Sequence, residues 1–245
     1  MKMDLKIIYQ DKNLLVIEKP APLIVFSETK TKQKTLSDIL LKNFNWFKNV
    51  GKPPRHGIIH RLDKETSGIV LIAKNKKTLD FLQNQFKEKK VIKKYIALTI
   101  GKIRQKKGEI ETLIGRDLKN RKKQKAFLIH SPDSKKKGKR KAKTYYKVLR
   151  LYSNKKQKFT LLELIPETGR KHQIRVHLSF LGHPIAGDKI YSFKQKNNLR
   201  NLKRQFLHAS YLKIRDVYEK EKEFTSELPS DLKNIIKSLK QISYD

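Results

Sequence analysis

The chain has 245 residues, 37% of them hydrophobic, and its 59 Lys and Arg against 23 Asp and Glu give a formal charge of +36. This apolar content supports one core and is too small for two large independent domains, so we expect a single domain over residues 1–245; the absence of cysteine excludes disulfides, thiolate zinc sites and a cysteine nucleophile. So large a positive excess destabilises a compact chain by self-repulsion unless a polyanion relieves it, which favours nucleic acid as the partner.

The basic residues do not form a membrane-binding pattern. They are spread over many segments and interleaved with Asn and Gln, rather than gathered on one amphipathic helix. The chain has no signal-peptide pattern at its start and no apolar run of the ~18 residues that a membrane span needs. We therefore expect a cytoplasmic protein that binds nucleic acid and no membrane, with monomer as the default oligomeric state.

A β-hairpin and a helix are predicted near the start of the chain. Residues 5–9 and 14–18 have strand character on either side of a short polar turn. Residues 36–47 then place apolar side chains at helical spacing, with Thr35 as the expected N-cap and Asp38 in the position of a capping box.

A polar loop directly before an apolar run contains the most informative residues. Residues 60–68 place Asp63 among basic neighbours, and residues 69–73 are apolar and rich in β-branched types. Such a run predicts a buried strand, so the loop is held by a rigid element and Asp63 is positioned. Taken alone, an Asp in a loop more often caps backbone groups in a turn.

The rest of the chain predicts an antiparallel meander between helices. Leu79, Leu82 and Phe86 mark a second amphipathic helix. Residues 131–143 contain almost nothing apolar, and we expect a mobile basic loop there. Strands are expected at residues 92–100, 109–114, 126–130, 144–152 and 158–165, and a last helix at residues 231–242.

A short helix that ends at Gly182 is predicted over residues 174–181. His172 and Arg175 are three residues apart and share a face, whereas His177 points elsewhere. This geometry, with the missing HExxH pattern and the missing cysteines, argues against a metal site.

Few parts of the chain can supply chemistry. Signals for phosphate-binding loops, dinucleotide sites, serine-hydrolase elbows and paired magnesium ions are absent, so we expect no cofactor. An Asp beside an Arg stays ionised at neutral pH, the state that a nucleophile or general base needs. A Tyr near a nucleobase can stack on it or transfer a proton. Asp63, Tyr95, Arg170 and Arg175 are thus the parts of a cofactor-free reaction on a nucleotide.

Several segments form an ordered set of motifs. Residues 60–68 have the form HRLDxxTSG, and residues 169–178 have the form GRxHQIRxHL. The others are residues 9–20, 93–98, 182–188 and 206–212. In this order they closely resemble the RNA pseudouridine synthases of the RluA branch over nearly the whole chain. The chain departs from the family pattern at Pro22, where glycine is usual, and at Arg215 and Asp216, where a His-Pro pair is often found.

The resemblance implies a fold and a reaction. The fold is α/β (α+β), with a mixed, mainly antiparallel central sheet, flanking helices and a central cleft. The reaction is the site-specific isomerisation of uridine to pseudouridine in structured RNA, ribosomal or transfer, without a cofactor.

The resemblance also implies roles for individual residues. Asp63 corresponds to the catalytic aspartate, which attacks ribose C1′ or assists proton removal there, and Arg175 to the arginine that pairs with it. Tyr95 corresponds to the tyrosine that stacks on the target base and helps remove the C5 proton. Arg61 matches a residue that helps take the uridine out of its stack. The candidates for substrate binding are Arg61, His60, Leu62, Thr66, Arg170 and His172.

The first motif begins within ten residues of the start, so we expect no separate small S4 RNA-binding domain before the catalytic one. RNA affinity must then come from basic strips on the body, although each strip can equally be a solvated lysine face. The candidate strips are residues 102–107, 119–125, 131–143 and 194–204.

Two other functions fit parts of the pattern. A non-catalytic RNA-binding or ribosome-assembly factor could use the same fold, but it has no need of an Asp facing phosphates. A metal-independent ribonuclease could use His60 or His172, and only cleavage of RNA by the pure protein would support it.

Overall fold

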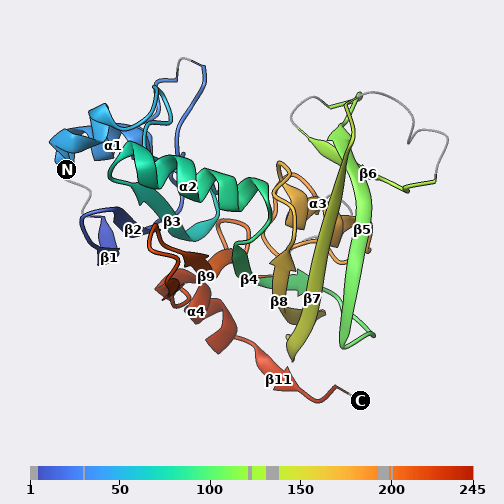
Figure 1. The fold of residues 1–245 in the computed structure, drawn as a ribbon. Helices are drawn as coiled ribbons and strands as arrows, with labels where there is room; N and C mark the ends of the chain where they lie inside the picture. The colour runs from blue at the N-terminus through green and yellow to red at the C-terminus, as the bar shows by residue number, and fades with distance from the viewer. Residues whose placement is uncertain are drawn as a thin grey trace. The chain divides into compact units, whose positions relative to one another are not determined.

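Antiparallel strand pairing is the main form of secondary structure in the computed structural model, which describes residues 5–29, 31–120, 123–130, 138–192, 199 and 201–244 (Figure 1). The chain forms two compact units. Unit 1 comprises Met1–Lys93 and His208–Glu227, and unit 2 comprises Lys94–Leu207 and Leu228–Asp245. None of the helices in the described residues is long and apolar enough to cross a membrane.

In unit 1, β2 pairs antiparallel with β1 and β3, and β3 pairs in parallel with β9 over only two residue pairs. The strands are β1 (Lys6–Gln10), β2 (Leu14–Lys19), β3 (Ser67–Ala73), β9 (Leu207–Arg215) and β10 (Glu221–Thr225). The helices are α1 (Leu36–Asn43), the 3-10 helix η1 (Asn45–Asn49) and α2 (Lys76–Lys87). This parallel pairing makes the sheet mixed, so the predicted mixed, mainly antiparallel α+β class is confirmed.

In unit 1, the structure confirms several elements that the local sequence predicted. β1 and β2 form the predicted hairpin, and every residue of β3 is buried, as its apolar run indicated. The Thr35 side chain accepts from the Asp38 amide while the Asp38 side chain accepts from the Thr35 amide, so the predicted capping box is present. Helix α1 is shorter than predicted: it ends at Asn43, and the 3-10 helix η1 follows. Phe47, which was predicted to lie on the helix, is buried in the core from η1.

In unit 2, the strands pair antiparallel in the order β4-β8-β7-β5-β6, and β11 pairs with the end of β7. The strands are β4 (Ile92–Ile100), β5 (Lys107–Arg116), β6 (Gln124–Phe127), β7 (Arg140–Ser153), β8 (Lys158–Pro166) and β11 (Lys240–Ile242). The helices are α3 (Gln173–Phe180) and α4 (Ser230–Lys237). Helix α3 contacts β5, β6, β7 and β8, and its apolar residues join the core of this unit.

The prediction of a mobile loop over residues 131–143 is wrong for its last residues, 140–143. Strand β7 already begins at Arg140, where it pairs with Ile114 of β5. Ala142 and Thr144 are buried while Lys141 is exposed and Lys143 partly exposed, so this lysine-rich stretch is a strand with one buried face. Residues 131–137 lie outside the described part of the chain.

Two further boundaries differ from the prediction. The expected helix over residues 231–242 ends at Lys237, and residues 240–242 form β11 instead, because their backbone pairs with residues 151–153 of β7. Strand β6 ends at Phe127, whereas the prediction extended it to residue 130.

Candidate active-site residues

The loop that carries Asp63 is a fixed turn in unit 1. The Thr66 amide donates to the Asp63 carbonyl at 3.0 Å, and the Leu23 amide donates to the Lys64 carbonyl at 2.9 Å. Strand β3 begins at the next residue, Ser67, and the Asp63 side chain is partly buried. The carboxylate is therefore carried on a hydrogen-bonded turn directly before a fully buried strand, as the sequence predicted.

A buried ammonium group supports the same turn. Lys19 is 0% exposed, and its Nζ donates to the carbonyls of Pro20 and Leu23 at 2.9 Å and of Lys64 at 3.3 Å. A buried charge needs polar partners to offset its lost hydration, and these carbonyls come from two segments far apart in sequence. Lys19 thus ties the end of β2 to the Asp63 loop. The sequence placed Lys19 in the motif of residues 9–20 but gave it no role.

The end of the loop is fixed to β9. The His208 Nε2 lies 3.0 Å from the Ser226 carbonyl, which can only accept, so Nε2 carries the proton. Its Nδ1 then accepts from the Ser67 hydroxyl at 2.9 Å. Beside this contact, Gly68 pairs with Ala209 so closely that a side chain has no room.

Leu62 and Thr66 were predicted to bind substrate. Both side chains are buried, at 5% and 2% exposure. Their role in substrate binding stays a prediction. Because the side chains are buried, they would act by fixing the conformation of the loop.

His60, also a predicted substrate-binding residue, is built into the scaffold of unit 1. Its Nε2 accepts from the Leu71 amide at 3.2 Å, and its ring stacks on Phe86 with a centroid distance of 5.1 Å. Burial, helped by the charges of Lys93 and Arg55, lowers the pKa of His60 to about 3. The ring is therefore neutral at physiological pH, and a role in substrate binding stays a prediction.

Arg61 rests on an aromatic ring beside a second guanidinium. Its Cζ lies 5.0 Å from the centroid of the buried Phe26 ring, and Arg55 lies 5.9 Å from the same centroid. Burial lowers the pKa of Arg55, and the neighbouring charge of Arg61 lowers it further. Arg61 itself is exposed, as its predicted contact with RNA requires.

In unit 2, Tyr95 lies in the partly exposed first half of β4, before the strand becomes fully buried at Ala97. It pairs with Leu164 of β8 and packs on the core of this unit while remaining partly exposed. A ring fixed by a sheet with part of its surface accessible is suited to stacking on a base. The predicted catalytic role is consistent with this placement.

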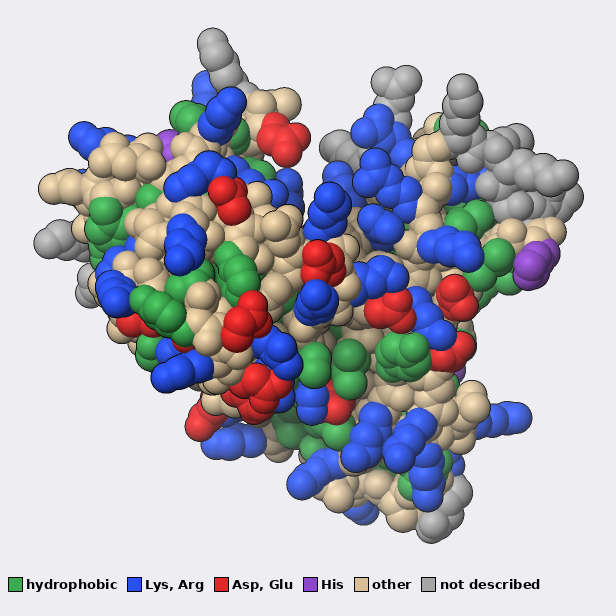
Figure 2. All heavy atoms as spheres, in the orientation of Figure 1, with side chains coloured by type: hydrophobic (Ala, Val, Ile, Leu, Met, Phe, Trp, Pro, Cys, Tyr) green, Lys and Arg blue, Asp and Glu red, His purple; other side chains and the backbone are tan. Residues whose placement is uncertain are grey.

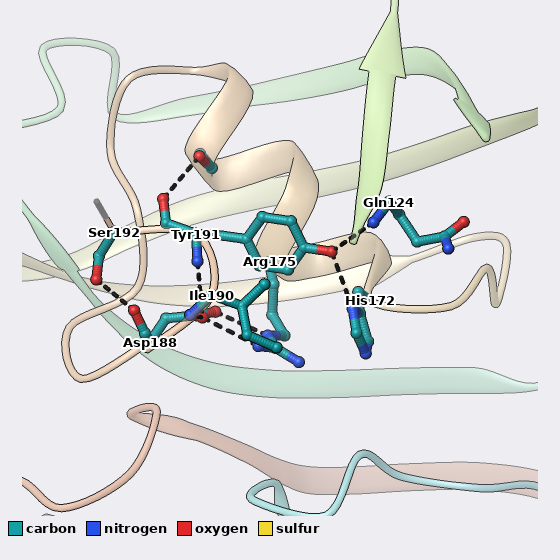
Figure 3. A network of polar contacts seen from close by, with 8 residues as sticks. Gln124, His172, Arg175, Asp188, Ile190, Tyr191 and Ser192 are labelled. Carbon is teal, nitrogen blue, oxygen red and sulfur yellow. Dashed lines mark hydrogen bonds and ion pairs between the residues drawn. The ribbon is translucent and has the colours of Figure 1, made fainter. Parts of the chain in front are cut away.

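Arg175 of α3 is buried in a network of polar groups (Figure 3). Its Nε donates to Asp188 Oδ2 at 2.7 Å, and its Nη2 donates to Asp188 Oδ1 at 3.0 Å. Its guanidinium also lies over the Tyr191 ring, 5.1 Å from the centroid. Sequence reasoning missed both partners, although Gly187 and Asp188 belong to a segment that resembles a family motif.

His172 and Arg175 both contact Tyr191, so the predicted shared face is confirmed. His172 precedes α3 with a left-handed φ of 57°, and its Nδ1 lies 2.9 Å from the Tyr191 hydroxyl. Arg170 is partly exposed, and its Nε donates to the Lys141 carbonyl at 3.0 Å. His177 lies apart and is bonded through its ring nitrogens to two threonines. Within the described ranges, no three His, Asp or Glu side chains are grouped as metal ligands.

One residue of the predicted basic strips has another role. Arg204 is buried, and its Nε and Nη2 donate to Asp231 at 2.7 Å and 3.1 Å. It therefore stabilises unit 2 and is removed from the candidate RNA contacts. Residues 121–122, 131–137, 194–198 and 200 of these strips lie outside the described part of the chain.

Two histidines with lowered pKa values should make the protein less stable in mild acid. Burial lowers the pKa of His177 to about 4, and the pKa of His60 is about 3. An unfolded chain binds a proton at each near pH 6.5, so between there and the folded values it holds more protons than the native state. The contribution of these histidines to the unfolding free energy should be fully present above about pH 6.5. Below pH 6.5 the unfolding free energy should fall, by up to about 1.4 kcal/mol per pH unit for each histidine.

Urea denaturation between neutral pH and pH 4.5 measures this slope. His177→Gln should flatten it, whereas the same change at exposed His130 is the matched control. An equal slope in His177→Gln and the unchanged protein would contradict the prediction.

A family model for RNA pseudouridylate synthases matches residues 13–180. An uncharacterised RNA pseudouridine synthase of Bacillus subtilis, YlyB, is 35% identical over 240 residues, which cover 98% of this chain and 74% of that protein. The ribosomal large subunit pseudouridine synthase D of Borreliella burgdorferi is 39% identical over 225 residues, which cover 91% of this chain and 65% of that protein. This chain therefore spans 65% to 74% of the length of these two relatives.

Solved structures agree with these relatives. Human RNA pseudouridylate synthase domain containing 4 matches with a TM-score of 0.75 at 29% identity, covering 96% of this chain and 94% of that one. Human RNA pseudouridylate synthase domain containing 1 matches with a TM-score of 0.77 at 26% identity, covering 99% of this chain and 91% of that one. The resemblance found in the sequence motifs is confirmed, and the chain belongs to the RNA pseudouridylate synthase family.

Proposed function

We propose that this protein converts a specific uridine to pseudouridine in the RNA of the large ribosomal subunit. The observation that carries the proposal is the HRLDxxTSG loop, in which Asp63 stands on a hydrogen-bonded turn before a buried strand. The substrate class is supported by relatives named ribosomal large subunit pseudouridine synthase, D in Borreliella burgdorferi and C in Rickettsia prowazekii, at 39% and 38% identity.

The reaction is an isomerisation in which atoms and charge balance. The C1′–N1 bond breaks, the uracil turns while it is held, and a C1′–C5 bond forms; C5 then loses its proton and N1 gains one. Asp63 acts at the ribose, either by attacking C1′ or by assisting proton removal there. Both routes need an ionised carboxylate, and both need it held still relative to the sugar.

Two residues of unit 2 complete the proposed set. Arg175 is proposed to act as the arginine that pairs with the catalytic aspartate in the family, and Tyr95 is proposed to stack on the base and help remove the C5 proton. Arg61, which is exposed in unit 1, would help take the target uridine out of its stack. His60, Arg170 and His172 are proposed to act in substrate binding.

RNA affinity is proposed to come from the surface of the chain. Lys and Arg side chains outnumber Asp and Glu on the face drawn in Figure 2. On β7, Lys141 and Lys147 are exposed on the face opposite the core, whereas Lys143 is paired with Glu109 at 2.9 Å. Contacts of lysines with phosphates are strong, salt-sensitive and independent of sequence. We place the reaction in the cytoplasm, with the protein acting as a monomer.

A pseudouridine map tests the proposal. Chemical labelling followed by primer extension is applied to total RNA from cells with and without the protein. We expect a stop at one or a few uridines of large-subunit ribosomal RNA to disappear without the protein and to return when the unchanged gene is restored. Identical maps would refute the enzymatic activity, and a lost stop in transfer RNA would refute the proposed substrate class.

A further inference from the structure

We propose that Asp188 and Tyr191 are positioning residues for the reaction, which hold the guanidinium of Arg175 in a single orientation. The inference rests on the proposed role of Arg175 and assigns a role to two residues outside the predicted catalytic set. It starts from the two-point contact in which Arg175 Nε and Nη2 donate to the two oxygens of Asp188. Such a bidentate pair defines the plane and direction of a guanidinium.

The Asp188 carboxylate is itself fixed. Its Oδ1 also accepts from the amides of Ile190 and Tyr191, at 2.8 Å and 3.1 Å, and the residue is 1% exposed. The backbone carbonyl of Asp188 accepts from the Ser192 hydroxyl, so the turn that carries the carboxylate is closed by its own hydrogen bonds (Figure 3). The acceptor that orients Arg175 therefore has little freedom to move.

Tyr191 restrains the guanidinium from a second direction. Its ring lies against the guanidinium, and its hydroxyl accepts from the Gln124 amide of β6 at 2.9 Å and bonds His172 at 2.9 Å. Its backbone carbonyl accepts from the Ser179 hydroxyl of α3 at 3.1 Å. The ring is thus held by a strand and by the residue before α3, and the backbone of Tyr191 is held by α3 (Figure 3).

These contacts determine which part of Arg175 can act. Asp188 engages the Nε–Nη2 edge, so the catalytic role falls to the side of the guanidinium that carries Nη1. A guanidinium that cannot rotate presents those donors without reorganisation during the reaction, which is the condition for efficient electrostatic stabilisation. Loss of the clamp should therefore affect the chemical step more than RNA binding.

The central test is a double-mutant cycle on the full chain. Product formation is followed by the release of tritium from C5-labelled uridine in an RNA fragment that contains the mapped site. Asp188→Asn should lower kcat by about 100-fold, the effect of a small misplacement of a catalytic group, with KM changed by less than about 3-fold. In an Arg175→Gln background the same change should lower kcat by less than about 3-fold, because Asp188 acts through Arg175.

The matched control is a second bidentate pair among the described residues of unit 2. Asp231→Asn breaks the contact of Asp231 with Arg204, whose distances of 2.7 Å and 3.1 Å are close to those of the Arg175 pair. It should lower the unfolding temperature without changing kcat. This separates the loss of an ion pair in general from the loss of the one that positions Arg175.

A second variant, Tyr191→Leu, tests the inference if Asp188→Asn does not fold. Circular dichroism shows whether Asp188→Asn is folded, and Tyr191→Leu removes the ring without leaving a buried charge unpaired. Tyr191→Leu should lower kcat by about 10-fold. If Asp188→Asn is folded, a wild-type kcat in this variant overturns the inference; if it is unfolded, a wild-type kcat in Tyr191→Leu does so. An equal loss of kcat in both backgrounds of the cycle also overturns it. These outcomes leave the proposed role of Arg175 in place. Wild-type kcat in Arg175→Gln overturns the proposed role of Arg175 and the inference together.

Discussion

Asp63→Asn should abolish pseudouridine formation while the protein remains folded. The change keeps the shape of the side chain and removes its charge, and an amide can neither attack C1′ nor accept a proton there. The contacts that fix the turn use the main chain, since Thr66 donates to the Asp63 carbonyl. Single-turnover assays should show a loss on the order of 10⁴-fold, the scale found when an essential catalytic group is removed.

Two measurements make this result specific. RNA affinity should not fall, because a carboxylate repels phosphates and its removal takes away no attraction. Asp80→Asn changes an exposed carboxylate of α2 in the same unit, and it should leave the rate unchanged. A rate within ten-fold of wild type in Asp63→Asn would end the catalytic assignment.

Gly68→Ala should be the most destabilising single-methyl change at the loop. Gly68 has φ +120°, where side chains are strained, and a Cβ there would lie 2.2 Å from the carbonyl oxygen and 2.7 Å from the nitrogen of Ala209. Both are backbone atoms of β9, so the parallel pairing between β3 and β9 would have to separate. We expect a loss of about 3 kcal/mol or more in unfolding free energy.

Gly182→Ala is the matched control for this prediction. Gly182 also has a positive φ, +84°, but nothing lies within 4 Å of its Cβ position. It should lose only the dihedral cost, about 1–2 kcal/mol. Urea denaturation of both variants measures the difference, and equal losses would show that the close approach to Ala209 is unimportant.

Local structure was largely predictable. The hairpin of β1 and β2, the capping box of Thr35 and Asp38, the buried strand β3 and the helix before Gly182 were all read from residues within a few positions of one another. Hydrophobic periodicity and turn chemistry act over this range, so one segment contains the whole signal.

Boundaries set by distant strands were not predictable in the same way. The lysine-rich stretch before Thr144 is a strand because its backbone pairs with β5, and residues 240–242 leave helical structure because they pair with the end of β7. Neither segment has a local pattern that favours strand, and the hydrogen bonds to a distant partner outweigh local propensity.

By itself, the sequence determined the family, the reaction that the family implies, and the turn that presents Asp63, because motif order and local periodicity are properties of the chain alone. Only the tertiary structure decided which groups hold the predicted residues: Asp188 and Tyr191 around Arg175, and Lys19 under the Asp63 loop. In a chain with 59 basic and 23 acidic residues, each carboxylate has many possible cationic partners along the sequence. The choice among them depends on distances of about 3 Å and on burial, and both exist only once the segments have packed together.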